Sequence, residues 1–182
     1  MNVYLKTIFR FCVLILLQVL ILDNNVNLLW WASPGGFPPF RPHIYQLFIL
    51  LLPFETPVWT LLLLGFATGL TVDSFLNTAG IHTCATVLLA YLRTNVLTAL
   101  LPRNLKEYSG MEPGLKNMGG VPFLTYCAFL LLIHHIVFYT IISWDVANLG
   151  RLLLQIIAST LTSMLFIVIY MLLFTRQSVY RL

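Results

Sequence analysis

The chain has 182 residues, of which 59% are hydrophobic and only 9% are charged, and its formal net charge is +4. So few charged side chains cannot cover a folded surface in water, so the composition excludes a water-soluble globular protein and indicates an integral membrane protein. The basic residues lie in short segments beside apolar runs and form no patch, which indicates membrane topology and argues against nucleic-acid binding.

Apolar runs bounded by Pro, Gly or charged residues predict the membrane-spanning helices. They lie at residues 7–22, 43–54, 57–76, 79–101, 121–142 and 149–174. About 20 apolar residues are needed to cross roughly 30 Å of hydrocarbon, so the short run 43–54 could instead be half of one kinked helix with its successor. We predict an all-α membrane protein with six transmembrane helices in a single domain, residues 1–182.

The distribution of Lys and Arg favours six passes with both termini in the cytoplasm. Cytoplasmic segments carry an excess of these residues near the span ends. In this topology the cytoplasmic side holds Lys6, Arg10, Arg103, Lys106, Lys116, Arg176 and Arg181, and the opposite side holds Arg41 and Arg151. Five passes would place residues 103–116 and the carboxyl-terminal tail outside, against this rule.

The connections between the runs have distinct compositions. The first run follows Lys6 and Arg10 like a signal sequence, but no small-x-small site follows it, so we expect it to stay in the protein as an anchor. Residues 23–42, with a Pro/Gly-rich stretch, predict a stiff external cap. Pro53 and Pro57 predict a tight cytoplasmic turn around Glu55, and residues 103–120 predict a compact polar cytoplasmic connector.

The cysteines give no sign of a metal site. Cys12, Cys84 and Cys127 lie far apart inside apolar runs, without a spacing that suits zinc. We expect them to be small buried hydrophobic side chains.

Residues 69–82, GLTVDSFLNTAGIH, place polar groups between two apolar runs. An ionisable residue at membrane depth costs roughly 2.5 to 3.5 kcal/mol, so it is a candidate for packing, partner or ligand contacts. Asp73 and Asn77 lie four residues apart and would share the face of a helix that ends near Leu76. Gly65 and Gly69 have the spacing that lets another helix approach closely. Either this face is structural or partner-binding, or Asp73 caps the fourth helix or sits among lipid headgroups.

The remaining polar candidates lie on the fourth and fifth predicted helices. His82 follows Gly80 at a helix start, where a neutral imidazole can hydrogen-bond to Asp73 or Asn77. Their positions make His134 and His135 point about 100° apart on their helix, so we expect them not to share a metal and we predict no metal site.

Arg93 lies about 16 Å along the helix from His82, at 1.5 Å per residue, which places it near the cytoplasmic face. It either snorkels to that face or is buried and paired with Glu55, and pairing with Asp73 is not expected.

Catalysis has little support in the sequence. Asp73, Ser74 and His82 contain the residue types of a hydrolytic triad, but no nucleophile elbow accompanies them. We therefore expect a protein that is not an enzyme and needs no cofactor.

The segment LQVLILDNN at residues 17–25, with LLPFETPVWTLLLLGFATGLTVDSFLNTAGIHTCATVLLAYLR at 51–93, resembles the rod shape-determining MreD family, and its bacteroidete branch most. This resemblance implies a six-span protein of the bacterial inner membrane, similar in fold to the substrate-binding subunits of energy-coupling-factor transporters. It also implies that MreC is a direct partner, with RodA and its penicillin-binding transpeptidase in the same complex and MreB filaments acting indirectly. On the family pattern Gly69, Asp73 and Gly80 are important to fold or partner contact, followed by Asn77, His82 and Arg93.

A second function also fits the sequence. Short helices, a cap-like external loop and abundant aromatic residues suit a small-molecule-binding membrane subunit of a transporter.

Overall fold

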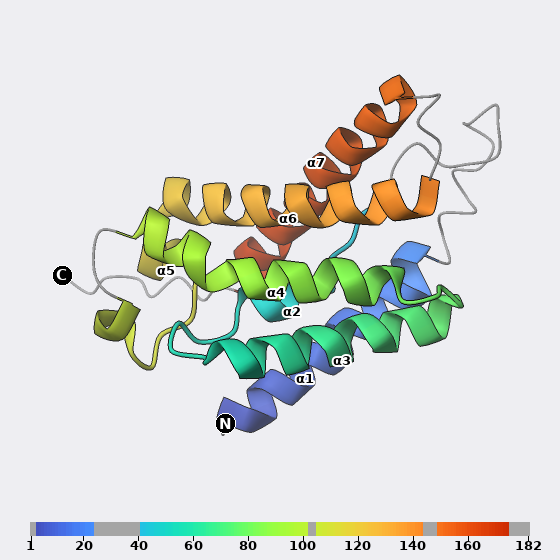
Figure 1. Cartoon of the computed structure of the whole chain (residues 1–182). Helices are drawn as coiled ribbons and strands as arrows, with labels where there is room; N and C mark the ends of the chain where they lie inside the picture. The colour runs from blue at the N-terminus through green and yellow to red at the C-terminus, as the bar shows by residue number, and fades with distance from the viewer. Residues whose placement is uncertain (1–2, 24–40, 102–104, 144–148, 175–182) are drawn as a thin grey trace.

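The computed structural model describes residues 3–23, 41–101, 105–143 and 149–174, and within them every regular element is helical (Figure 1). The longer helices are α1 (Val3–Leu16), continued by a π-helical segment (Leu17–Asp23), α3 (Val58–Leu76), α4 (Ile81–Leu100), α6 (Gly120–Ser143) and α7 (Leu149–Phe174). The short ones are α2 (Leu47–Leu50), a 3₁₀ helix (Leu105–Tyr108) and α5 (Leu115–Met118). The all-α class predicted from the sequence is confirmed for these residues.

The helices α3, α4, α6 and α7 are long and apolar enough to cross a membrane, with 19, 20, 24 and 26 residues. They correspond to the predicted runs 57–76, 79–101, 121–142 and 149–174, and each packs against the next, α3 on α4, α4 on α6 and α6 on α7 (Figure 1). Large apolar side chains cover their outer faces, as expected where lipid is the solvent. The chain is therefore a multi-pass helical membrane protein, while the number of passes and the cytoplasmic termini remain predictions.

The predicted second span, residues 43–54, is not a transmembrane helix. Only the short helix α2 forms there, and the side chains from His43 to Leu52 are all buried inside the protein. Its backbone contacts lie at opposite ends of the bundle: Arg41 N–H donates to Tyr139 Oη (3.2 Å), and Phe54 N–H donates to Met111 O (3.1 Å). We call residues 41–54 the central segment, because it runs through the interior between the surrounding helices.

A turn separates the central segment from α3, so the alternative of one kinked helix through both runs is also wrong. Thr56 N–H donates to Pro53 O (3.1 Å), and α3 begins only after Pro57. The tight turn predicted around Glu55 is confirmed. The predicted connector at 103–120 holds the 3₁₀ helix and α5 within its described part, and its Glu112 pairs with Arg10 at 2.7 Å. This ion pair brings the connector to the α1 end that the sequence also assigns to the cytoplasm.

Two of the cysteines do not lie in the core. Cys127 is buried as expected, but Cys12 and Cys84 are on the outside of the bundle, so the prediction of three buried thiols is wrong for these two. The external cap predicted at 23–42 lies outside the described residues except for its ends.

Close packing of α3 on α4 depends on the two predicted small residues. A Cβ added to Gly69 would lie 2.4 Å from Thr83 Cα, and one added to Gly65 would lie 2.9 Å from Ala90 Cβ. The close-approach surface predicted from the four-residue spacing therefore exists. Its partner is a helix of the same chain, α4, whose backbone touches that of α3 at Gly69.

We predict that Gly69→Ala destabilises the protein, because neither the Thr83 backbone nor the α3 backbone can move away from the added methyl group. Overpacking of this kind costs about 1–3 kcal/mol. Thermal unfolding of the detergent-solubilised protein should show a lower midpoint. Gly150→Ala in α7 is the matched control, because no atom of the described residues lies within 4 Å of an added Cβ there. Equal midpoints for the two variants would show that the α3–α4 contact is not tight.

Candidate functional site

Asp73, near the end of α3, caps the start of α4. Its Oδ1 accepts from the backbone N–H of His82 (3.1 Å), and its Oδ2 accepts from the N–H (2.8 Å) and hydroxyl (2.6 Å) of Thr83. Thr78 in the intervening turn donates to Oδ1. Gly80, the residue before α4, has no side chain and a left-handed φ of 81°, so Asp73 supplies the side-chain acceptor that the helix start needs. Of the roles that the sequence left open for Asp73, the structure shows that it caps the fourth predicted helix, α4.

Asn77 does not share a helix face with Asp73. The helix α3 ends at Leu76, and Asn77 follows it with φ 53° and ψ 39°, its N–H bonded to Asp73 O. Its side chain is exposed. Asparagine tolerates this left-handed conformation better than most residues, so its role here is to end the helix.

The His82 imidazole is buried and does not bond to Asp73 or Asn77, contrary to the sequence prediction. Its Nδ1 lies 3.0 Å from the hydroxyl of Tyr45 in the central segment, and that hydroxyl also lies 2.8 Å from His134 Nε2. Thr86 donates to the His82 carbonyl (2.7 Å) one turn below. Tyr45 thus bridges α4 and α6 from inside the bundle.

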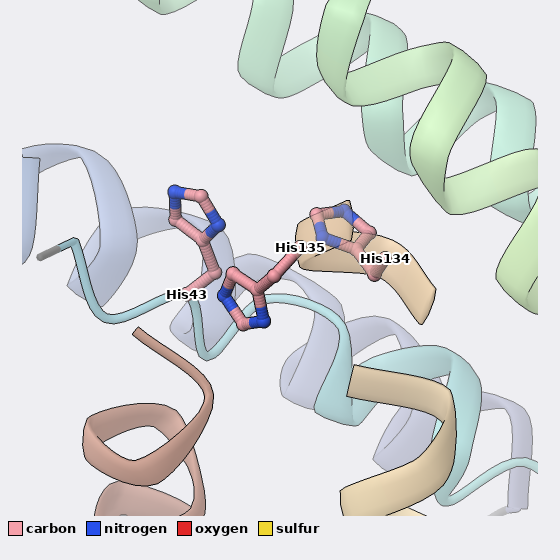
Figure 2. Close-up of side chains that lie close together, drawn as sticks. All are labelled: His43, His134 and His135. Atoms are coloured by element: carbon pink, nitrogen blue, oxygen red, sulfur yellow. The ribbon is translucent and has the colours of Figure 1, made fainter. Parts of the chain in front are cut away.

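All four histidines of the chain meet in one buried cluster. The His43 ring centre lies 5.2 Å from that of His82, 5.8 Å from that of His134 and 5.2 Å from that of His135, and it stacks on His135 with an interplanar angle of 11°. Figure 2 shows His43 on the chain before α2 and the other two labelled residues on α6. We call His43, His82, His134 and His135 the histidine cluster.

Several ring nitrogens of the cluster are buried without a hydrogen-bond partner among the described residues. They are His43 Nδ1 and Nε2, His82 Nε2, His134 Nδ1 and His135 Nε2. Each such group costs about 1–3 kcal/mol when nothing satisfies it, so a cluster of them calls for a bound partner. Phe138 closes one side, with its ring centre 4.8 Å from that of His43.

The sequence argument against a shared metal at His134 and His135 fails. One ring nitrogen each of His43, His134 and His135 lies within 4.8 Å of the others. The two neighbours do leave α6 in different directions, but His43 comes from the central segment and their side chains turn toward it (Figure 2). The hydropathy pattern gave no indication that His43 would lie beside His134 and His135. The available signal was that every histidine lies in or beside an apolar run.

Arg93 is fully buried on α4, so the expectation that it snorkels to the surface is wrong. The alternative, a buried Arg93 paired with Glu55, was right about the burial of Arg93 and wrong about its partner. Arg93 Nη2 donates to the carbonyl of Leu52 and, at 3.3 Å, to that of Pro53, whereas Glu55 accepts from Ser109. The guanidinium therefore holds the end of the central segment where it turns toward α3.

The residues of the hydrolytic triad do not assemble. Ser74 is exposed, and its hydroxyl donates to Leu70 O (2.7 Å) on its own helix. Asp73 is occupied by the α4 cap, and His82 points to Tyr45.

Comparison of the chain with protein-family models, with curated proteins and with solved structures found no match.

We predict that Asp73→Ala destabilises the protein, because the N–H groups of His82 and Thr83 lose their acceptor in a buried place. Loss of a helix cap costs about 0.5–2 kcal/mol, and burial of the orphaned donors places this site at the upper end. Thermal unfolding in detergent should show the loss, with Asp73→Asn intermediate because an amide oxygen still accepts. Ser74→Ala on the exposed face is the control. A midpoint for Asp73→Ala equal to that control would contradict the capping role.

We predict that Arg93→Met destabilises the protein by about 1–3 kcal/mol, because the buried carbonyl of Leu52 loses its donor. Arg93→Lys should recover part of the loss, since an ammonium group can reach one carbonyl. The control is Arg151→Met, at an exposed position on α7. Limited proteolysis at the Pro53–Pro57 turn gives a local readout: faster cleavage in Arg93→Met alone is expected, and unchanged cleavage would argue against this anchor.

Proposed function

We propose that this chain is a non-enzymatic scaffold in the bacterial inner membrane that binds MreC, as its resemblance to the MreD family implies. Its place would be in the complex that builds the lateral peptidoglycan wall of rod-shaped cells. In that complex MreC links the scaffold to RodA and its penicillin-binding transpeptidase, and MreB filaments act from the cytoplasm.

The observation that carries the proposal is how residues 69–82 are used, because they are the most specific part of the resemblance. Gly69 lies against the Thr83 backbone, and both carboxylate oxygens of Asp73 are occupied by hydrogen bonds to the start of α4. These polar groups join α3 and α4 into a helical hairpin. A segment that specifies shape rather than reactivity suits a protein whose work is to hold others in place.

The outer faces of the bundle offer surface for the membrane helices of partners. Exposed apolar side chains run along α3, including Leu63, Phe66 and Leu70, and along α7, including Leu161 and Leu165. Helices associate in lipid through van der Waals packing and interhelical hydrogen bonds, so these faces are open to contact with partner helices but carry no specific packing motif. The internal use of Gly65 and Gly69 removes them from this outer surface, so a direct MreC contact belongs on other residues.

A cleft favours the second candidate, a small-molecule-binding subunit of a transporter. It has a volume of about 390 Å³ and lies between the middle of α1, residues 112–117 and the end of α7. This volume falls within the roughly 300–1,000 Å³ of typical ligand sites. Most of its lining residues are apolar, and Arg10 and Glu112 there pair with each other, so its ligand would be largely apolar with Lys116 as a charged contact.

The deciding experiment is co-purification from native membranes. The protein carries a carboxyl-terminal tag, is extracted in mild detergent, and its partners are identified by mass spectrometry. The scaffold proposal expects an MreC-like protein together with RodA and its transpeptidase. Recovery of paired ATPases with a coupling subunit, and without an MreC-like protein, would overturn it in favour of the transporter subunit.

Site-specific photocrosslinking makes the same test local. A photoreactive residue placed at exposed Phe66 on α3 or Leu161 on α7 leaves the buried contacts intact. The scaffold proposal expects at least one of these faces to yield a cross-link to MreC, and the non-irradiated sample is the control. Asp73 variants are unsuitable for this purpose, because they would disturb the fold and the partner surface together.

A further inference from the structure

We propose that His43, His134 and His135 form a buried site for a transition-metal ion of the kind that imidazole binds, such as Zn²⁺ or Co²⁺. The site joins the central segment to α6, and His82 and Tyr45 flank it. It is independent of any scaffold or transporter role.

The first support is convergence. The chain has four histidines, on the central segment, α4 and α6, and all are within 1% of complete burial in the same place. Histidines kept for packing alone would have no reason to gather. Imidazole is the commonest side-chain ligand for zinc, copper and nickel ions, and a set of three leaves a fourth position open for water or another ligand.

The second support is that the required lone pairs are free. His135 Nδ1 lies 2.8 Å from the Leu131 carbonyl, which can only accept, so Nδ1 carries the proton and Nε2 presents a lone pair. That Nε2 has no partner among the described residues. A histidine held by a backbone carbonyl through one nitrogen while the other faces the ion is the usual arrangement in metal sites.

Tyr45 sets the tautomer of His134 in the same way. Its hydroxyl has a single proton and lies between His82 Nδ1 and His134 Nε2. When Tyr45 donates to His82 and accepts from His134 Nε2–H, His134 Nδ1 presents its lone pair toward the cluster. Tyr45 is thus a positioning residue for His134, and His82 supports it.

The third support is distance. One ring nitrogen of each histidine lies within 4.8 Å of the other two, whereas nitrogens bound at about 2.0–2.1 Å to one tetrahedral ion lie roughly 3.4 Å apart. The rings must therefore close on the ion by a little over an ångström. His43 can make most of this movement without breaking a hydrogen bond to the described part of the chain, where neither of its ring nitrogens has a partner.

Two charged residues near the site affect how favourably a cation binds there. Asp73 interacts electrostatically with His82 and favours a cation nearby, whereas Arg41 acts on both His43 and His82 and opposes it. Three neutral imidazoles add no negative charge of their own. Neutral imidazole ligands favour a transition-metal ion over Mg²⁺ or Ca²⁺, which need carboxylate and carbonyl oxygens.

The test uses the full chain, purified in detergent through a tag that contains no histidine, stripped with a chelator and titrated with Co²⁺. Visible absorption of tetrahedral Co²⁺ reports coordination, and competition with Zn²⁺ reports affinity. We expect saturable binding of a single ion with tetrahedral bands, lost in His43→Gln and in His135→Gln. Cys12→Ser and Cys84→Ser, which alter the exposed thiols, should bind as the unmodified protein does.

Tyr45→Phe separates positioning from ligation. It keeps the three ligands but removes the hydroxyl that orients His134, so the tetrahedral bands should remain while affinity falls about 10- to 100-fold.

X-ray absorption of the Zn²⁺-loaded unmodified protein needs no variant and should show imidazole scattering from three ligands. Absence of saturable binding, or binding unchanged in both histidine variants, would falsify the proposal. So would a zinc spectrum with sulfur or only oxygen neighbours.

Discussion

The structure depends on one constraint: the central segment runs through the protein interior without forming a full helix. Backbone N–H and C=O groups that are neither in a helix nor in water need other hydrogen-bond partners. Each such group left without a partner costs several kcal/mol in a membrane. Side chains of the surrounding helices meet this demand. Gln18 bonds to Pro42 O and Ile44 N, Ser159 to Arg41 N, Ser163 to His43 N, Tyr126 to Leu50 O, Arg10 to Leu51 O and Arg93 to Leu52 O.

This constraint explains why polar residues interrupt otherwise apolar helices. Gln18 and Ser163 would weaken a helix that faced lipid, but each is fully buried and serves a backbone group of the central segment. Arg93 is the extreme case, since a charge is expensive to bury: its Nη2 reaches two carbonyls at the turn, while its Nε and Nη1 are buried without a partner among the described residues. The same irregular backbone places His43 and Tyr45 between α4 and α6, so the histidine cluster is a consequence of this segment.

The sequence predicted those features that depend on local pattern. Run length located α3, α4, α6 and α7, prolines located the turn after Pro53, and the Gly65 and Gly69 spacing predicted a close helix contact. It failed for residues 43–54, because an apolar run reads the same in a buried coil as in a helix. It also could not assign long-range partners: Asp73 bonds to backbone N–H groups, and Arg93 bonds to carbonyls on a segment about 40 residues earlier.

The Asp73 cap of α4 and the histidine cluster meet at His82. Its backbone N–H is held by the Asp73 cap, and its ring is held by Tyr45 of the central segment. The geometry of the α3–α4 hairpin therefore fixes where the Tyr45 hydroxyl sits and, through it, the orientation of His134. An ion bound by His43, His134 and His135 would tie the central segment to α6 directly. Because such an ion binds only the folded arrangement, it would stabilise that arrangement in proportion to its affinity and concentration.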